Sequence, residues 1–300
     1  MDLFHWLTES RNNIEKDGIG GIRESLWPVY RKFLEQGRRF QPAGDNIYDY
    51  SWDLLIVVDS CRYDLMCEVA NQYDYIPKVD SHWSVDSTTA YWMRRTFKHD
   101  QIKETTYICS NPFSDNLVDN NKFKKVVELW KCVWEEPGTV PPQAVTDETI
   151  RAMRGTNSDR TIAHYLQPHC PFIPKPFSQK KLNEFSSHDH RDVWELYRDR
   201  DITLDELWEG YRKNLELVLD NIHTLLESVN GDVVITSDHG NALGKWGIYG
   251  HPPRMPHSSL RTVPWIETEA TNTNGYEPDS WIKEHDMEKQ DQLKALGYLD

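Results

Sequence analysis

Residues 52–64 read WDLLIVVDSCRYD, and this stretch decides the fold. Five aliphatic residues, 54–58, are followed at once by a carboxylate, Asp59. An uninterrupted apolar run of this length predicts a strand of a parallel sheet that is covered on both faces, because a strand with one wet face alternates apolar and polar residues. Ligands of such sheets gather at the carboxyl ends of the strands. We therefore expect Asp59 to lie where a ligand binds.

A second stretch, residues 231–251, repeats the pattern in GDVVITSDHGNALGKWGIYGH. Its apolar run ends just before Asp238 and His239. Side by side with the first strand, it would bring two carboxylates and an imidazole together. This mixed oxygen and nitrogen set favours zinc or manganese, with calcium or magnesium as the alternatives. Each Asp alone is better explained as a cap of the helix that follows it, but the pair with an adjacent His favours a metal site.

The composition narrows the class of protein. The chain has 300 residues, enough for one large α/β domain. Its net charge of −14 argues against nucleic acid, and equally against an anionic membrane surface, as the main partner. Five cysteines without a C-x-x-C pair are typical of a reducing compartment. No apolar run approaches the roughly twenty residues of a membrane helix. We expect a soluble cytoplasmic protein with no membrane span.

The rest of the pattern alternates strands with helices. Residues 1–50 are expected to form an N-terminal helical arm, since apolar residues recur at helical spacing from position 22 to 33. This alternation predicts an α/β fold with a mainly parallel central sheet covered by helices on both faces. The expected strands are 53–58, 105–109, 162–166 and 232–236, and the expected helices are 88–98, 122–135, 146–153 and 204–229.

Residues 85–93, VDSTTAYWM, place several hydroxyls at the start of a predicted helix. The free N–H groups and the dipole of a helix N-terminus favour an anionic ester. A hydroxyl that also ligates a metal becomes a nucleophile, because the metal lowers its pKa. Plain helix capping is the alternative for this stretch.

Three histidines and an arginine complete the candidate residues. His164 and His169 stand in IAHYLQPHCPF, and His251 stands in GIYGHPP. Near a metal and an anion, imidazoles bind substrate oxygens or protonate a leaving group. Arg62 could clamp a phosphate in a bidentate manner, or could equally form an ion pair with Asp64.

Together these motifs resemble the alkaline phosphatase superfamily, and specifically its sulfatase-like hydrolase and transferase branch. LLIVVDSCRYD is similar to the first metal-ligand strand of that family, YLQPHCPF to its H-x-P-x-[FY] segment, and VVITSDHGNALGKWGIYGH to its D-H-G…G…G…H segment. LRTVPWI and QLKALGYLD also resemble family endings. The motifs follow the family's order from residue 52 to 300, which implies a sulfatase-like catalytic domain over residues 51–300.

The resemblance implies the metal ligands and the nucleophile. Asp59, Asp238 and His239 match the ligands of the family's first metal site, which the nucleophile completes. VDSTTAYW is similar to the D-S-A-A-x-A and D-T-x-T-G-H-W forms of related phosphatases and mutases, and that register selects Ser87. An S-x-T register would select Thr89 instead. We favour Ser87.

The resemblance also implies roles for the histidines, and it has gaps. His169 and His251 match residues that contact the substrate or a second metal, whereas His164 is a poorer match. None of the five cysteines lies in the C-x-P-[SA]-R context from which formylglycine is made, so a formylglycine-dependent sulfatase is not expected. The D-x-x-x-H pair of the two-metal branch is also missing. We therefore expect one tightly held divalent metal, with any second one held more weakly.

The sequence thus predicts a metal-dependent hydrolase or transferase of phosphate esters. It would work through a hydroxyl nucleophile and a covalent phosphoenzyme. The substrate would be a small-molecule, glycan-linked or lipid-linked phosphate ester. Two alternatives stay open, a sulfatase without formylglycine and a catalytically inactive binding protein of the same fold.

Overall fold

The computed structural model describes residues 11, 19–40, 42–155, 159–175, 192–273 and 275–281.

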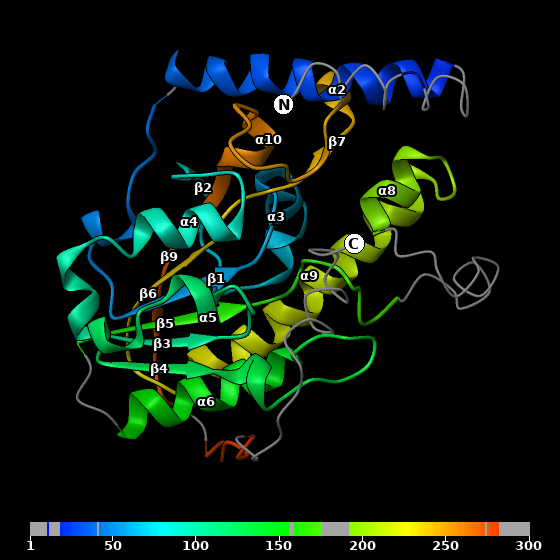
Figure 1. Ribbon diagram of the computed structural model, residues 1–300. Coiled ribbons are helices and arrows are strands. Elements are labelled where there is room, and N and C mark those ends of the chain that lie inside the picture. The colour runs from blue at the N-terminus through cyan, green and yellow to red at the C-terminus, as the bar shows by residue number, and fades with distance from the viewer. Residues whose placement is uncertain are drawn as a thin grey trace.

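A seven-stranded sheet organises this part of the chain (Figure 1). The spatial order of its strands is β2-β9-β6-β1-β5-β3-β4. The five strands from β6 to β4 are parallel, whereas β9 runs antiparallel to β6 and β2 antiparallel to β9. The prediction of a mainly parallel sheet is therefore confirmed. The strands are β1 (Leu54–Val58), β2 (Asp80–Trp83), β3 (Thr105–Cys109), β4 (Lys125–Glu128), β5 (Arg160–Tyr165), β6 (Gly231–Thr236) and β9 (Thr262–Ala270), and a separate hairpin joins β7 (Ala242–Leu243) to β8 (Tyr249–Gly250).

Helices cover both faces of the sheet, as predicted (Figure 1). The α-helices are α2 (Ile19–Gly37), α3 (Tyr63–Val69), α4 (Thr89–Thr96), α5 (Ser114–Leu117), α6 (Pro142–Gly155), α8 (Val193–Arg198), α9 (Leu204–Leu226) and α10 (Ser258–Arg261). Alternate residues of β1 show why the strand is apolar throughout. Leu54, Ile56 and Val58 join the buried cluster that contains α3, α6 and α9. Leu55 and Val57 join the cluster on the other face, beneath α4.

The register between β1 and β6 aligns the two acidic endings. Leu54 pairs with Val233 and Val57 pairs with Thr236. Continuing this register past the ends of both strands brings Asp59 level with Asp238. The two stretches of sequence that predicted the sheet are therefore neighbours at its centre.

The predicted helix at 122–135 is wrong. Its residues form the edge strand β4 and a short 3-10 turn, Leu129–Lys131. The β-branched pair Val126 and Val127 fits the pleated edge beside β3, while Leu129 and Trp130 are buried. Periodicity alone does not separate a short buried strand from a helical turn.

Helix α2 is the longest described element of the predicted N-terminal arm. It runs across the end of the molecule beside α10 and β7 (Figure 1). Its Trp27 and Leu34 pack against a small buried cluster, formed by Ala242, Ile248, Met255 and Leu260. The boundary at residue 50 stays a prediction. Over the described ranges, every helix is too short or too polar to cross a bilayer.

Candidate active site

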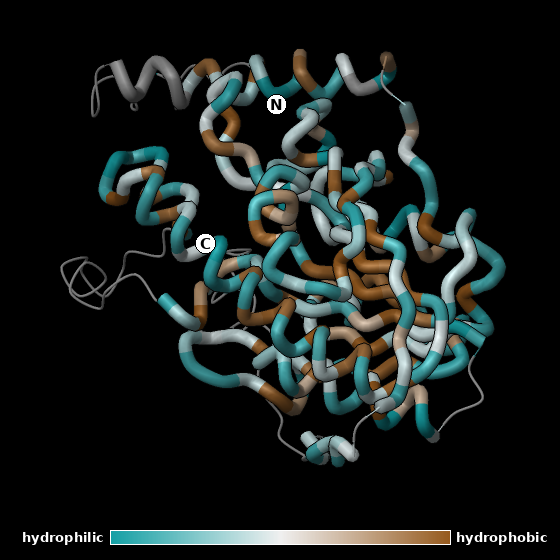
Figure 2. Tube along the Cα trace, turned by 180° about the vertical axis from the view of Figure 1, so that it is seen from behind, coloured by the Kyte–Doolittle hydropathy of each residue, from teal (hydrophilic) through white to brown (hydrophobic). Residues whose placement is uncertain are grey.

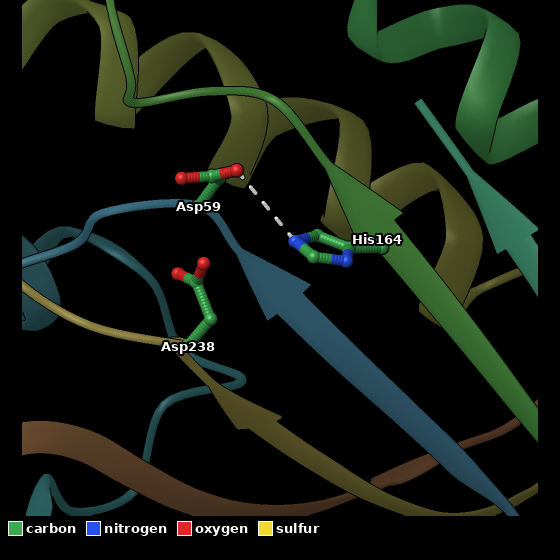
Figure 3. A group of neighbouring side chains, drawn as sticks. All are labelled: Asp59, His164 and Asp238. Carbon is green, nitrogen blue, oxygen red and sulfur yellow. Dashed lines mark ion pairs between the residues drawn. The ribbon is translucent and has the colours of Figure 1, made fainter. Parts of the chain in front are cut away.

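Asp59 and Asp238 face each other beyond the carboxyl ends of β1 and β6 (Figure 3). Both side chains are fully buried. The amide of Ser60 donates a hydrogen bond to Asp238 Oδ1 (2.9 Å), and the Ser60 hydroxyl donates to Asp59 Oδ1 (2.8 Å). One residue therefore links the two carboxylates. The sheet brings together the pair that the two apolar runs predicted.

His239 and Thr89 lie against the same carboxylates. His239 Nε2 is 3.4 Å from Asp238 Oδ2 and 4.0 Å from Asp59 Oδ1. Thr89 Oγ1 lies 3.2 Å from His239 Nε2 and 3.3 Å from Asp59 Oδ2. Thr89 is the first residue of α4, behind the N-cap Thr88. The start of this helix thus carries a hydroxyl into the acidic cluster.

The tautomer of His239 follows from its other ring nitrogen. Nδ1 lies 2.9 Å from the carbonyl oxygen of Gly240. A carbonyl only accepts, so Nδ1 carries the hydrogen of the neutral ring and Nε2 turns a lone pair toward Asp238. Two lone pairs facing each other at 3.4 Å repel unless a cation lies between them. Fixing the tautomer through a backbone carbonyl is also the usual arrangement of a metal-ligating histidine.

His164 adds a further nitrogen at this point (Figure 3). It lies in β5 beside β1, fully buried, with Nε2 3.7 Å from Asp59 Oδ2. Its Nδ1 is 2.8 Å from the Tyr107 hydroxyl. The donor atoms of Asp59, His164 and Asp238 all lie within 4.8 Å of one another.

Unpaired buried atoms support the fit of a metal. Among the described residues, neither His164 Nε2 nor Asp238 Oδ2 has a hydrogen-bond partner, although both atoms are buried. Leaving such groups without partners costs about 1–3 kcal/mol each, and bound cations are a common reason for it. The residues present therefore fit a divalent metal.

The two carboxylates differ in their electrostatics. Burial, and then repulsion from Asp238, raises the pKa of Asp59 well above its ordinary value. Burial acts in the same sense on Asp238, but the imidazoles of His239 and His164 outweigh it and lower the pKa of Asp238. Two carboxylates this close do not both stay ionised in an apolar interior without a compensating positive charge. A cation at this point would provide that charge.

Ser87 and Thr89 have different surroundings. The Ser87 hydroxyl donates to the carbonyl oxygen of Pro252 (3.0 Å) and accepts from the amide of Met255 (3.1 Å). These bonds hold it to the segment between β8 and α10. The structure thus brings Thr89, and not Ser87, into hydrogen-bonding distance of Asp59 and His239.

His169 and His251 form a pair beside the acidic cluster. Their Nε2 atoms are 3.2 Å apart, and the ring of His251 lies 4.6 Å from that of His239. The Cys170 carbonyl accepts a hydrogen bond from His169 Nδ1, so the neutral ring turns its Nε2 lone pair toward His251. Burial lowers the pKa of His169 to about 4 and lowers that of His251 as well. Both imidazoles are therefore neutral near pH 7.

Arg62 forms an ion pair with Asp64, one of the two roles that the sequence left open for it. Its Nε donates to Asp64 Oδ1 (2.8 Å), and its Nη1 donates to the carbonyl oxygen of Asn241 (2.6 Å). The guanidinium also lies over the ring of Trp208. Arg62, Asp64 and Trp208 line a surface cavity of about 450 Å³ beside α9.

Two contributors were not identified from the sequence. Asn111 donates from Nδ2 to Asp59 Oδ2 (2.9 Å), and Tyr107 positions His164. Asn111 follows the end of β3, just as Asp59 follows the end of β1. A polar residue after a predicted buried strand was therefore the signal that could have found it.

No protein-family model and no curated protein matches this chain. Solved structures do match it. The soluble domain of lipooligosaccharide phosphoethanolamine transferase A from Neisseria meningitidis is similar over 72% of this chain and 75% of its own, with a TM-score of 0.52 and 16% identity. The integral membrane protein lipooligosaccharide phosphoethanolamine transferase A (EptA) from the same species is similar over 89% of this chain, with a TM-score of 0.52 and 14% identity.

The matched region spans 58% of that integral membrane protein's length. At identities this low, the likeness is one of fold. The chain therefore shares the fold of this phosphoethanolamine transferase domain.

Proposed function

We propose that this chain is a metal-dependent enzyme that cleaves or transfers phosphate esters, with Thr89 as its nucleophile. One observation carries the proposal. Asp59, Asp238, His239 and Thr89 converge in a buried cluster in which lone pairs face one another without enough protons to pair them. A divalent cation held there would supply positive charge, lower the pKa of the Thr89 hydroxyl and draw charge from the phosphate oxygens.

The choice of Thr89 over Ser87 departs from the register that the sequence favoured. It is supported by the contacts of the two hydroxyls. Thr89 Oγ1 lies within hydrogen-bonding distance of two candidate metal ligands. Ser87 Oγ instead forms hydrogen bonds with the backbone of Pro252 and Met255. A nucleophile must be within hydrogen-bonding reach of the group that takes its proton, and Thr89 meets this condition with Asp59.

The first step forms a bond between Thr89 Oγ1 and phosphorus and breaks the bond between phosphorus and the ester oxygen. The Thr89 proton passes to the Asp59 carboxylate, 3.3 Å away. The leaving oxygen takes a proton from water, because the His169 and His251 rings are neutral and hold no acidic proton to give. Asn111 holds Asp59 in place throughout. The products are a phosphothreonine enzyme and an alcohol.

The second step restores the enzyme. Water, or an acceptor alcohol, forms a bond to phosphorus as the bond to Thr89 Oγ1 breaks. The His pair takes the proton of the attacking hydroxyl, and Thr89 regains its own proton from Asp59. Water gives a hydrolase, and an alcohol gives a transferase.

Zinc or manganese is the metal proposed, because the ligand set is two carboxylates, an imidazole and a hydroxyl. One tight site is proposed, with the His169–His251 pair as the only weaker position suggested by the described side chains. The substrate is proposed to be a small-molecule, glycan-linked or lipid-linked phosphate ester, and the location to be the cytoplasm. All five cysteines, which lie in the described ranges, are free thiols.

The test combines metal analysis, an ester panel and trapping. Chelator-treated protein is reloaded with zinc or manganese and assayed with p-nitrophenyl phosphate, its diester and p-nitrophenyl sulfate. The expected result is phosphate release and an acid-quenched phosphate adduct on the peptide that contains Thr89. Turnover of sulfate but not of phosphate would select the sulfatase without formylglycine. Metal binding without any turnover would select the inactive binding protein.

A further inference from the structure

Helix α2 exposes an apolar stripe to solvent. Leu26, Val29, Tyr30 and Phe33 follow the i, i+3, i+4, i+7 spacing of one helix face. Leu26 is 53% exposed, Val29 51% and Phe33 73%. Phe40, just beyond the helix, is 86% exposed. Contiguous apolar side chains at such exposure indicate a surface that binds another protein or a membrane.

The exposed stripe lies on a helix that is already anchored to the molecule. Trp27 and Leu34 pack against the cluster beneath α2, and Gly37 approaches Pro256. The stripe is therefore distinct from the side of α2 that holds it to the domain. Figure 2 shows this helix at the rim of the molecule, with hydrophobic residues at intervals along it.

The charge of the same segment indicates what kind of partner binds the apolar stripe. Residues 19–40 are cationic within a chain of net charge −14. Lys32 and Arg39 are exposed beside the stripe. An amphipathic helix with aromatic and aliphatic residues on one face and Lys or Arg on the others lies in the plane of an anionic bilayer. The segment contains five basic residues, Arg23, Arg31, Lys32, Arg38 and Arg39, and two acidic ones, Glu24 and Glu35.

The support beneath α2 connects this face to the active site. The cluster under the helix contains Ile248 and Met255, and the chain between these two residues supplies His251. Trp246, just before this segment, is a further exposed aromatic residue, at 51%. A partner bound to α2 would therefore lie next to the segment 248–255, which supplies His251 to the candidate site.

We propose that α2 docks this protein in plane on the surface of an anionic lipid bilayer, through its exposed apolar stripe and its basic residues. Docking would bring the His251 segment to that surface. Resting on the proposed function, this selects phosphate esters carried by lipids as the substrate class. This proposal departs from the expectation, drawn from net charge alone, that an anionic membrane surface is not the main partner.

The test measures vesicle binding by the full-length protein. Wild type is sedimented with vesicles of phosphatidylcholine alone, or of equal parts phosphatidylcholine and phosphatidylglycerol. The variant is Leu26→Asp with Phe33→Asp, and its matched control is Leu204→Asp, at an exposed apolar position of α9. A second variant, Lys32→Glu with Arg39→Glu, is matched by Lys78→Glu with Lys122→Glu, at exposed lysines elsewhere.

Wild type and both controls are expected to sediment with the anionic vesicles and to be released by salt. Both α2 variants should bind about tenfold less. Absence of binding by wild type, or equal binding by the α2 variants, would overturn the proposal. So would self-association in light scattering that the Leu26 and Phe33 changes abolish, because the face would then cover a second copy. Binding lost only on deletion of residues 1–18 would assign the contact to that segment instead.

Activity separates this proposal from the proposed function. On soluble p-nitrophenyl phosphate the α2 variants should match wild type, because no changed residue contacts the candidate site. On a phosphate ester embedded in anionic vesicles, the turnover rate of the α2 variants should fall by about the same factor as their vesicle binding. Vesicle binding without turnover would leave the docking surface intact and count against the enzyme. Equal turnover of vesicle-borne substrate by variant and wild type would refute the link between docking and substrate.

Discussion

The amide of Ser60 donates a 2.9 Å hydrogen bond to Asp238 Oδ1, across 178 residues of chain. Ser60 has a φ of 63°, a conformation that costs a residue other than glycine about 1–2 kcal/mol. The Tyr211 hydroxyl and the Asn241 amide both donate to the Ser60 carbonyl oxygen. Strain of this kind persists where the surroundings enforce it, typically at functional sites. The turn after β1 thus holds the two carboxylates at a fixed separation.

Tyr211→Phe is expected to loosen this turn. Loss of the buried hydroxyl should cost about 1–2 kcal/mol in the free energy of unfolding. Tyr75→Phe is the matched control, because the Tyr75 hydroxyl donates to the Leu219 carbonyl of α9, outside the site. Both variants should lose similar stability in urea unfolding. Only Tyr211→Phe should also lose metal affinity, by about tenfold. Equal metal affinity in the two variants would show that the Ser60 turn does not position the ligands.

Thr89→Ala and Ser87→Ala should behave in opposite ways. Thr89→Ala removes the proposed nucleophile and should reduce the turnover of a phosphate ester by about 10³-fold or more. Ser87→Ala should keep turnover within about tenfold of wild type, while it lowers the free energy of unfolding by about 1–2 kcal/mol through its lost contacts with Pro252 and Met255. Steady-state rates and urea unfolding provide the two readouts. The reverse pattern would return the role to Ser87.

The sequence could predict the acidic pair but not the hydroxyl. Asp59 and Asp238 were predictable, because two uninterrupted apolar runs force central parallel strands whose ends meet. Ser87 and Thr89 are two residues apart in one stretch, and local sequence does not say which one turns inward. That choice is made by Pro252 and Met255, from a distant segment.

The edge strands of the sheet also could not be predicted from the local sequence pattern. β4 was predicted as a helix because its valines are embedded in residues at helical spacing, and only pairing with β3 makes them a strand. β9 pairs with both β6 and β2, so its antiparallel course depends on partners far away in sequence. Tertiary pairing outweighs local propensity in such strands.

Tyr107→Phe tests whether His164 helps to hold the metal. The Tyr107 hydroxyl is the hydrogen-bond partner of His164 Nδ1, and Nε2 faces Asp59. Removing a residue that orients a ligating imidazole lowers metal affinity by about 10–100-fold. Chelator competition should show this loss in Tyr107→Phe. Tyr165→Phe is the control, since its buried hydroxyl pairs with Thr146 instead. Unchanged affinity in Tyr107→Phe would remove His164 from the metal site.

Gly240 explains the glycine of the D-H-G segment. A Cβ at this position would overlap the carbonyl oxygen of Ser259, and the Gly240 amide donates to the Leu260 carbonyl (2.9 Å). Gly240→Ala must therefore push the backbone after His239 away from α10. We expect a loss of about 2–4 kcal/mol in the free energy of unfolding, as for other overpacked buried positions. Gly155→Ala, with open space at its Cβ, should change stability by less than about 1 kcal/mol. A stable Gly240→Ala protein with full metal affinity would contradict this account.

His257 should make stability depend on pH. Its Nδ1 accepts a hydrogen bond from the Ser259 amide at the start of α10, and the ring is buried. Burial, and then the charges of Lys245 and Arg62, lower its pKa from 6.5 to about 4. Between these values the unfolded chain binds a proton that the folded chain does not, so the free energy of unfolding rises with pH across this window. The contribution of this one group is about 1–3 kcal/mol.

His257→Asn keeps a capping acceptor but cannot titrate, so urea unfolding of the metal-free variant should show a shallower rise than wild type. His223→Asn, which removes an exposed imidazole of α9, controls for the loss of a histidine as such. Parallel curves for His257→Asn and wild type would mean that His257 is not the titrating group.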